Sequence, residues 1–280
     1  MKRVLMLSVV LSVAMGTAIA FAQSDEKQEP PKPFPGGSGK FTKLVWADEF
    51  DGTGLPNPEK WGYEKGYVRN KELQYYTTAR AENAVQEDGN LVITARKGAF
   101  EDGGKTHEIT SASVTSRGKQ AWKYGRIEAR AKVPSSLGTW PAIWMLPEKS
   151  PYGGWPKGGE IDILEHVGYD PDKVHFNAHT GKYNHTRGTG RGTNVALKDP
   201  HKDFHIYAVE WTEDEMDWYL DDKKVFSIKN DGSGPDAWPF DQPFYVIVNF
   251  AFGGAWGASK GVDVDSLPQK FYIDYVRVFQ

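Results

Sequence analysis

The chain has 280 residues, of which 39% are hydrophobic and 25% are charged, as in an ordinary folded protein. Its formal net charge of −3 provides no basic excess to neutralise phosphates, which argues against a nucleic-acid partner. The absence of cysteine excludes disulfide bonds, cysteine nucleophiles and cysteine-based metal sites.

The first 22 residues have the pattern of a signal peptide. Lys2 and Arg3 precede an apolar run, and Ala20-Phe21-Ala22 matches a cleavage site between small residues. The apolar run is shorter than the roughly 20 residues that span a bilayer, and small residues rather than a basic segment follow it. We therefore expect secretion to the periplasm or the extracellular space, with no membrane attachment after cleavage.

Residues 23–40 are rich in proline, glycine and charge, and this composition predicts a flexible linker. Residues 41–280 contain neither a second change in composition nor a repeat of fixed period. We expect these residues to form one domain and the protein to be a monomer.

Strand signals dominate this domain. From Tyr124 to Val133, small or apolar residues alternate with charged ones, which indicates a half-buried antiparallel strand. Helical periodicity over three turns is absent. Further short strands are predicted at residues 91–95, 143–146, 161–164, 206–211, 217–220, 244–250 and 271–279. Many short strands separated by turn residues predict an all-β fold of two packed antiparallel sheets, either a jelly roll or another sandwich.

Acidic residues interrupt one of these apolar strands at Glu160, Asp162 and Glu165. In a regular strand Glu160 and Asp162 share a face, whereas Glu165 points to the opposite one. A β-bulge between Asp162 and Glu165 would bring all three to one face, and bulges often lie beside active sites. The two glutamate Cα atoms would then be about 13 Å apart, a gap that their long side chains can close.

Two carboxyl groups on one face suit a retaining glycosidase, which needs them about 5–5.5 Å apart. One carboxylate attacks the anomeric carbon, while the other donates a proton and later activates water. Mutual repulsion among three acids should raise the pKa of at least one of them, and we expect Glu165 to be the protonated acid.

The sequence Glu160-Ile161-Asp162-Ile163-Leu164-Glu165 resembles the active-site signature of glycoside hydrolase family 16, in its bulged, laminarinase-like form. The resemblance covers nearly all of residues 42–280, with further motifs at residues 70–76, 124–130, 140–146, 207–211 and 274–278. It implies a concanavalin-like jelly roll and a single catalytic domain over residues 41–280. It also implies that Glu160 is the nucleophile, Glu165 the general acid/base, and Asp162 the residue that tunes the nucleophile.

The same resemblance implies a set of substrate-binding residues and a structural metal site. The metal would be calcium, held by Glu49, the Gly89 carbonyl and Asp274, and oxygen ligands suit that ion. No cofactor is expected for catalysis. For each tryptophan of the set, a place in the core is the alternative, whereas the outward alternation of Arg126 favours the cleft. The implied substrate contacts are Asn70, Arg126, Trp140, Trp144, His179 and Trp256.

We therefore expect endo-hydrolysis of β-1,3 linkages in a laminarin-like β-glucan, with retention of configuration. One alternative is a hydrolase or transglycosylase of another β-glycan, such as mixed-linkage glucan or a galactan of the agarose or carrageenan type. Arg187 and Arg191 are candidate contacts for a sulfated galactan. A second alternative is a non-catalytic, lectin-like carbohydrate-binding module. His175 and His179 are spaced like a helical zinc pair, but the local sequence predicts a strand that holds them about 13 Å apart.

Overall fold

The computed structural model describes residues 40–280. The predicted signal peptide (1–22) and all but the last residue of the predicted linker (23–40) lie outside the described residues. Within residues 40–280, helix is limited to the short turns α1 (Gly254–Gly257), η1 (His185–Arg187) and η2 (Val264–Ser266). No helix in this part of the chain is long and apolar enough to cross a membrane.

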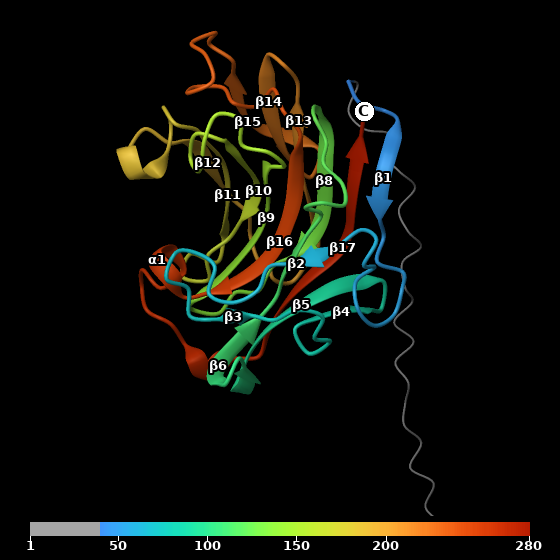
Figure 1. Ribbon diagram of the computed structural model, residues 1–280, viewed down its shortest axis with the longest axis vertical. Coiled ribbons are helices and arrows are strands. Elements are labelled where there is room, and N and C mark those ends of the chain that lie inside the picture. The colour runs from blue at the N-terminus through green and yellow to red at the C-terminus, as the bar shows by residue number, and fades with distance from the viewer. Residues whose placement is uncertain (1–39) are drawn as a thin grey trace, which may run out of the picture. The chain divides into compact units, whose positions relative to one another are not determined.

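The remaining elements of residues 40–280 form two β-sheets (Figure 1). The larger sheet contains β1 (Leu44–Asp48), β3 (Tyr75–Tyr76), β4 (Ala84–Glu87), β5 (Asn90–Asp102), β6 (Lys105–Ser111), β8 (Gly125–Lys132), β13 (His205–Trp211), β14 (Glu215–Leu220), β15 (Lys223–Lys229) and β17 (Gln269–Phe279). Its order is β15-β14-β13-β8-β17-β5-β6-β3, with β1 paired to β17 and β4 paired to β5. All of these pairings are antiparallel except that of β3 with β6.

The smaller sheet holds the acidic strand predicted from the sequence. It contains β2 (Gly62–Tyr63), β7 (Ser113–Thr115), β9 (Thr139–Pro147), β10 (Glu160–Glu165), β11 (Lys173–His179), β12 (Arg191–Ala196) and β16 (Phe244–Phe252). Its order is β12-β11-β10-β9-β16-β7-β2, so β10 lies inside the sheet between β11 and β9. The predicted fold class, an antiparallel jelly-roll β-sandwich, is confirmed.

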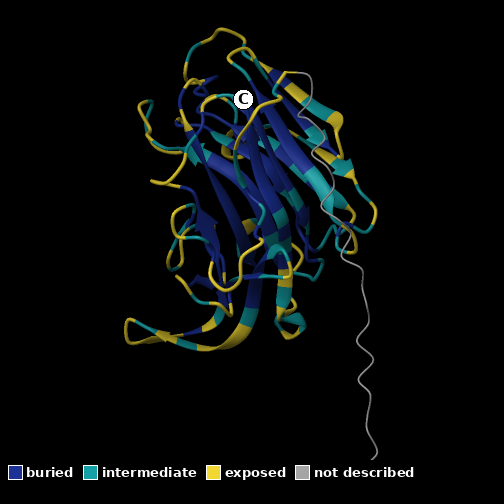
Figure 2. Ribbon diagram, turned by 90° about the vertical axis from the view of Figure 1, so that its right-hand side faces the viewer, coloured by how far each residue is buried: buried dark blue, intermediate teal, exposed yellow. Residues whose placement is uncertain are grey.

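The core lies between the two sheets, because each sheet turns one apolar face inward. Ile127 of β8, Ile161 of β10 and Val248 of β16 all belong to this core and are fully buried. Figure 2 shows buried strands through the middle of the molecule and exposed residues mainly in the loops and hairpin ends. A fully buried Val, Ile or Phe side chain contributes about 1.5–3 kcal/mol, so a core of this size can stabilise the fold without disulfides.

Two strands are more buried than simple alternation predicts. In β8 the charged residues Arg126 and Glu128 are buried as well as the apolar ones, because they pair with each other on the outer side of the sheet. In β16 every residue is buried. Its second face carries Tyr245 and Ile247, which pack with Trp144 and Ala142 of β9 in a smaller apolar cluster. That face of β9 and β16 forms the base on which the candidate site is built.

Candidate active site

The predicted β-bulge is present in β10. Asp162 lies opposite Asn177 of β11, whereas Glu165 lies opposite His175, so three residues of β10 span two residues of its partner. The pairing with β9 is displaced in the same way, since Asp162 faces Trp144 and Glu165 faces Ala142. The extra residue restores the phase of the strand. Glu165 therefore shares a face with Asp162, as the sequence predicts.

A cleft of about 840 Å³ lies over this face of the smaller sheet. All three acids line it, together with five of the six predicted substrate-binding residues. Those five are Asn70, Trp140, Trp144, His179 and Trp256.

Glu165 is held by two hydrogen bonds at the bottom of the cleft. The indole Nε1 of Trp140 donates to its Oε1 at 3.2 Å, and the amide Nδ2 of Asn177 donates to its Oε2 at 2.9 Å. Burial raises the pKa of Glu165 to about 7, although both hydrogen bonds act in the opposite direction. A carboxyl group with this pKa is suited to donate and accept a proton near neutral pH.

Glu160 receives a hydrogen bond from an aromatic side chain that lines the cleft. The indole Nε1 of Trp155 donates to its Oε2 at 2.8 Å. Burial, followed by the charge of Glu165, raises the pKa of Glu160 to about 8, while the hydrogen bond from Trp155 lowers it. Burial also raises the pKa of Asp162 well above its usual value, with the charges of both glutamates adding to the effect.

These shifts modify the expectation for Glu165 in two respects. The pKa values of all three acids are raised, so Glu165 is not the only acid of the cluster that holds its proton more tightly than usual. The largest cause in each case is burial rather than mutual repulsion.

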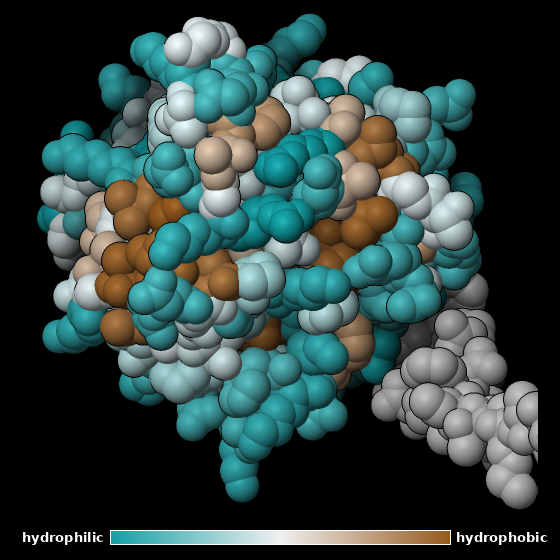
Figure 3. Space-filling view, turned by 90° about the horizontal axis from the view of Figure 1, so that it is seen from below, coloured by the Kyte–Doolittle hydropathy of each residue, from teal (hydrophilic) through white to brown (hydrophobic). Residues whose placement is uncertain are grey.

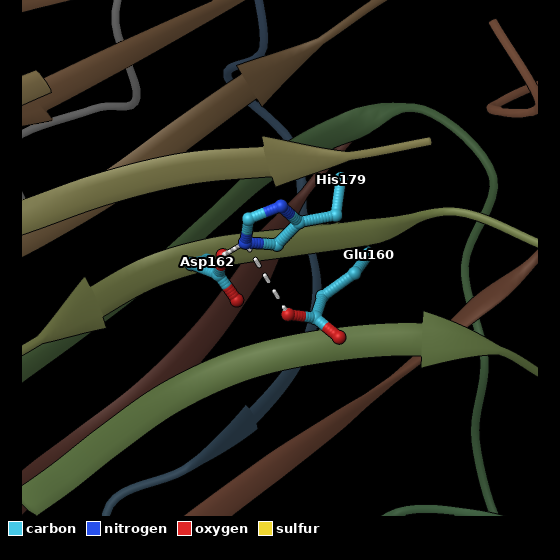
Figure 4. A group of neighbouring side chains, drawn as sticks. All are labelled: Glu160, Asp162 and His179. Carbon is cyan, nitrogen blue, oxygen red and sulfur yellow. Dashed lines mark ion pairs between the residues drawn. The ribbon is translucent and has the colours of Figure 1, made fainter. Parts of the chain in front are cut away.

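His179 lies at the end of β11, opposite Glu160. Its Nε2 is 3.5 Å from Oδ2 of Asp162 and 3.8 Å from Oε1 of Glu160 (Figure 4). Burial lowers the pKa of His179 to about 4, so the imidazole is neutral at pH 7. His179 therefore adds a polar group beside the acids without adding charge.

Aromatic side chains form one wall of the cleft. The rings of Trp140 and Trp256 meet edge to face with centroids 5.5 Å apart, and His175 packs on Trp256 at 4.8 Å. The indole Nε1 of Trp256 donates to the hydroxyl of Tyr169 at 2.7 Å, which fixes the orientation of its ring. Flat rings of this kind can stack on the apolar face of a sugar.

A buried hydrogen-bond chain supports the floor of the cleft. Nε1 of Trp144 donates to Asn249 at 2.7 Å, Asn249 donates to the hydroxyl of Tyr76 at 2.9 Å, and that hydroxyl donates to Glu72 at 3.3 Å. The guanidinium of Arg69 lies over the ring of Trp144, 4.9 Å from its centroid. Trp144 is only 7% exposed, so it both lines the cleft and packs in the smaller apolar cluster.

The prediction that Arg126 binds substrate is wrong. Arg126 belongs to β8 in the larger sheet and does not line the cleft. Its guanidinium pairs with Glu128 at 2.7 Å, Asp222 at 2.8 Å and Glu210 at 3.4 Å. Alternation correctly indicated that Arg126 points away from the core, but β8 is in the sheet that does not carry the site.

The residues predicted to bind calcium come from neighbouring strands of the larger sheet. Glu49 follows β1, Asp274 lies in β17, and Gly89 forms the turn between β4 and β5, with β1 and β5 each paired to β17. Both carboxylate oxygens of Glu49 accept from Arg277, and Oδ2 of Asp274 accepts from Arg130 at 2.6 Å. The buried Oδ1 of Asn90, next to Gly89, has no hydrogen-bond partner. The donors are all oxygen, as calcium requires, but two arginines already occupy the two carboxylates.

Several residues of the cleft were not predicted from the sequence. Trp155 lies in a Pro- and Gly-rich loop, and nothing in the sequence placed it beside Glu160. The candidates for sulfate contact, Arg187 and Arg191, do not line the cleft. Arg191 instead packs on the ring of Tyr183, 3.5 Å from its centroid. Among the residues missed are Arg69, Glu72, Trp155, His175, Asn177, His185 and Asn249.

Comparisons with known proteins agree with this arrangement. Residues 71–277 match the family described as Glycosyl hydrolases family 16. The chain is 51% identical over 247 residues to the Beta-glucanase of Rhodothermus marinus, with 85% of each chain covered. The solved laminarinase of Rhodothermus marinus superposes with a TM-score of 0.81 at 49% identity, covering 85% of this chain and 97% of that one. The chain also resembles a solved non-specific endo-beta-1,3(4)-glucanase that has 1,3-beta-D-cellobiosyl-glucose at its active site. The two superpose with a TM-score of 0.82 at 42% identity, over 86% of this chain and 95% of that one.

Proposed function

The chain belongs to glycosyl hydrolase family 16, and from that premise we propose that it hydrolyses internal β-1,3 linkages of laminarin-like β-glucan with retention of configuration. The observation that carries the proposal is the bulged strand β10, which directs Glu160 and Glu165 into one aromatic-lined cleft. The hydrolases named Beta-glucanase and laminarinase in the comparisons support the choice of substrate.

In the first step, a carboxylate oxygen of Glu160 attacks the anomeric carbon and the glycosidic C–O bond breaks. Glu165 donates its proton to the departing oxygen, which leaves a covalent glycosyl-enzyme and an ionised Glu165. The hydrogen bond from Trp155 stabilises Glu160 in its ionised, attacking form. The donors Trp140 and Asn177 stabilise the carboxylate that forms on Glu165.

In the second step, Glu165 takes a proton from water, and the water oxygen bonds to the anomeric carbon while the bond to Glu160 breaks. The product therefore has the configuration of the substrate, and both glutamates return to their starting states. Asp162 is too deeply buried to reach a sugar easily, at 2% exposed, and acts through Glu160. Its hydrogen bond to Glu160 lowers the pKa of that carboxyl group.

The charge of the cleft favours a neutral polymer over a sulfated one. Arg69 is the one arginine or lysine among the described residues that line it, whereas four carboxyl groups line it. A polyanionic galactan would meet carboxylates without enough cations to compensate them. A neutral glucan can instead stack on the indoles of Trp140 and Trp256.

Two further features are part of the proposal. The Lys2–Ala22 segment supports export through cleavage of a signal peptide, which N-terminal sequencing of the protein recovered outside the cell would test. A structural calcium ion at Glu49, Gly89 and Asp274 is supported by the oxygen donors and the unpartnered Oδ1 of Asn90. If calcium binds there, EDTA lowers the melting temperature and added Ca²⁺ restores it; a melting temperature indifferent to both would contradict the site.

Product analysis tests the function. The protein would be incubated in parallel with laminarin, lichenan, agarose and carrageenan. Short β-1,3-gluco-oligosaccharides from laminarin are expected, and they should be absent with Glu160→Gln. Glu87→Gln, at a half-exposed glutamate of the larger sheet that pairs with Lys270, is the matched control and should retain activity. Preferred release of galactan fragments would contradict the assignment of β-glucan as the substrate. Activity retained in Glu160→Gln would contradict the assignment of Glu160 as the nucleophile.

Transglycosylation remains compatible with the same first step, because a sugar hydroxyl can replace water in the second. Products longer than the starting oligosaccharide would reveal it in the same experiment. A lectin-like module would bind laminarin without releasing any product.

A further inference from the structure

Three potential metal ligands meet where β10 and β11 pair at the edge of the cleft. Glu160 and Asp162 project from β10, and His179 projects from β11 directly opposite Glu160. One ligand atom from each residue lies within 4.8 Å of the other two. Figure 4 shows both carboxylates near the ring edge of His179 that carries Nε2.

One acceptor that faces this cluster lacks a partner. Oδ2 of Asp162 is buried and has no hydrogen-bond partner, whereas Oε2 of Glu160 accepts from Trp155. The separation of 3.5 Å between Asp162 and His179 is too long for a good hydrogen bond. In residues 40–280 no lysine or arginine forms an ion pair with Glu160 or Asp162. A buried acceptor without a partner is costly, and a cation would satisfy it.

We propose that a divalent transition-metal ion, with Zn²⁺ as the representative, binds to Glu160, Asp162 and His179. Tetrahedral zinc with bonds of about 2.0–2.2 Å places its ligand atoms roughly 3.3–3.6 Å apart. The separations of 3.5 Å and 3.8 Å from Nε2 of His179 need little adjustment to reach this geometry. An imidazole nitrogen with two carboxylates suits zinc or copper, whereas magnesium and calcium prefer oxygen ligands alone.

Nε2 is the ring nitrogen of His179 that faces both carboxylates, so it is the nitrogen placed to bind the ion. The pair His175 and His179 is a different case. His175 lies opposite Glu165, four residues before His179 on β11, so it is outside the cluster.

The consequence for activity rests on the proposed function. An ion bound to Glu160 occupies the carboxylate that would attack the anomeric carbon. It also places a positive charge where the sugar must sit. Zinc should therefore inhibit reversibly and compete with the glucan, and a chelator should restore full activity.

Calorimetric titration of the full-length chain with Zn²⁺ tests the site without any turnover. We expect one ion to bind per chain, with affinity at least about tenfold weaker in Glu160→Gln and in His179→Gln, since even loss of an outer contact costs 10–100-fold. His205→Gln is the matched control, because His205 lies on β13 of the larger sheet and pairs with Asp221. It should bind zinc as the unmodified protein does, and Mg²⁺ should not bind at this site.

Two results would overturn the inference. One is an unchanged zinc affinity in Glu160→Gln and His179→Gln, and the other is a failure of a β-1,3-gluco-oligosaccharide to compete with zinc. Thermal unfolding shows whether each variant is folded. If one variant is not folded, the zinc affinity of the other decides the test. If zinc binds but no glycan is hydrolysed, the proposed function is contradicted and the metal site stands. If laminarin is hydrolysed but zinc does not bind, the metal site is contradicted and the proposed function stands.

Discussion

Replacing Arg126 by methionine separates a structural role from a substrate contact. Arg126 is 1% exposed, and its partners Glu128 and Glu210 are each 2% exposed. Methionine keeps much of the side-chain volume but leaves both buried carboxylates without their cation. Removing one partner of a buried ion pair typically costs about 3–5 kcal/mol. The third partner, Asp222, is 52% exposed in its side chain and adds little.

This loss is large enough to measure directly. For a domain of this size, 1 kcal/mol shifts the melting temperature by about 2–4 °C, so Arg126→Met should lower it by roughly 6–20 °C. Arg130→Met, on the same strand, is the matched control because its partner Asp274 is 33% exposed in its side chain. It should cost no more than about 1 kcal/mol. Calorimetry measures both variants, and KM for laminarin at a temperature where both are folded should not change. A raised KM with an unchanged melting temperature would refute this reasoning and indicate that Arg126 contacts the substrate.

Three further predictions concern the cleft. Trp155→Phe removes the hydrogen bond to Glu160, and a hydrogen bond to a charged group is worth about 1.5–3 kcal/mol. We therefore expect kcat/KM to fall about tenfold to a hundredfold while the melting temperature stays constant. Unchanged kinetics would contradict this role of Trp155. The pH profile of kcat/KM should decline as pH rises through about 7, where Glu165 loses the proton it donates, and a decline only above pH 9 would contradict that assignment. Because the pKa of Glu165 is raised on folding from 4.5 to about 7, the folded state binds more protons in that window and stability is lost as pH rises through it. Glu165→Gln should therefore gain stability relative to the unmodified protein at pH 9 but not at pH 4, and an equal difference at both pH values would contradict the shift.

The bulge could be predicted because one short segment contains all the information needed. Side chains alternate with a period of two, so the spacing of Asp162 and Glu165 puts them on one face only if a residue is inserted. The strand pairings with Asn177 and Trp144 confirm that insertion. The fold class followed in the same way, from the period and length of many short strands.

The residues around the acids depend on pairings that are distant in sequence. Arg126 alternates as expected, but alternation does not reveal which sheet a strand joins, and β8 joins the larger one. Asn177 reaches Glu165 only because β11 pairs with β10 in the displaced register. Trp155 reaches Glu160 through a loop, for which no periodic rule exists. Such contacts follow from the tertiary structure and not from local pattern.

The cause of the raised pKa values also lay beyond the sequence. Three acids at close spacing predicted repulsion, but burial is the largest cause for Glu160, Asp162 and Glu165. The depth of the cleft depends on the aromatic wall and on the floor beneath Trp144, which come from separate strands and loops. The chemistry of the acids is therefore set largely by residues far from them in the chain.

Trapping the covalent intermediate tests the central claim most directly. A laminaribiosyl donor with fluorine at C2 and a good leaving group should form the glycosyl-enzyme quickly and hydrolyse it slowly. Mass spectrometry of the digested protein should then find one added 2-fluorolaminaribiosyl group on the peptide at Glu160, and none in Glu160→Gln. A label on Glu165 would reverse the two roles, and an absent label with inverted product would contradict the retaining mechanism.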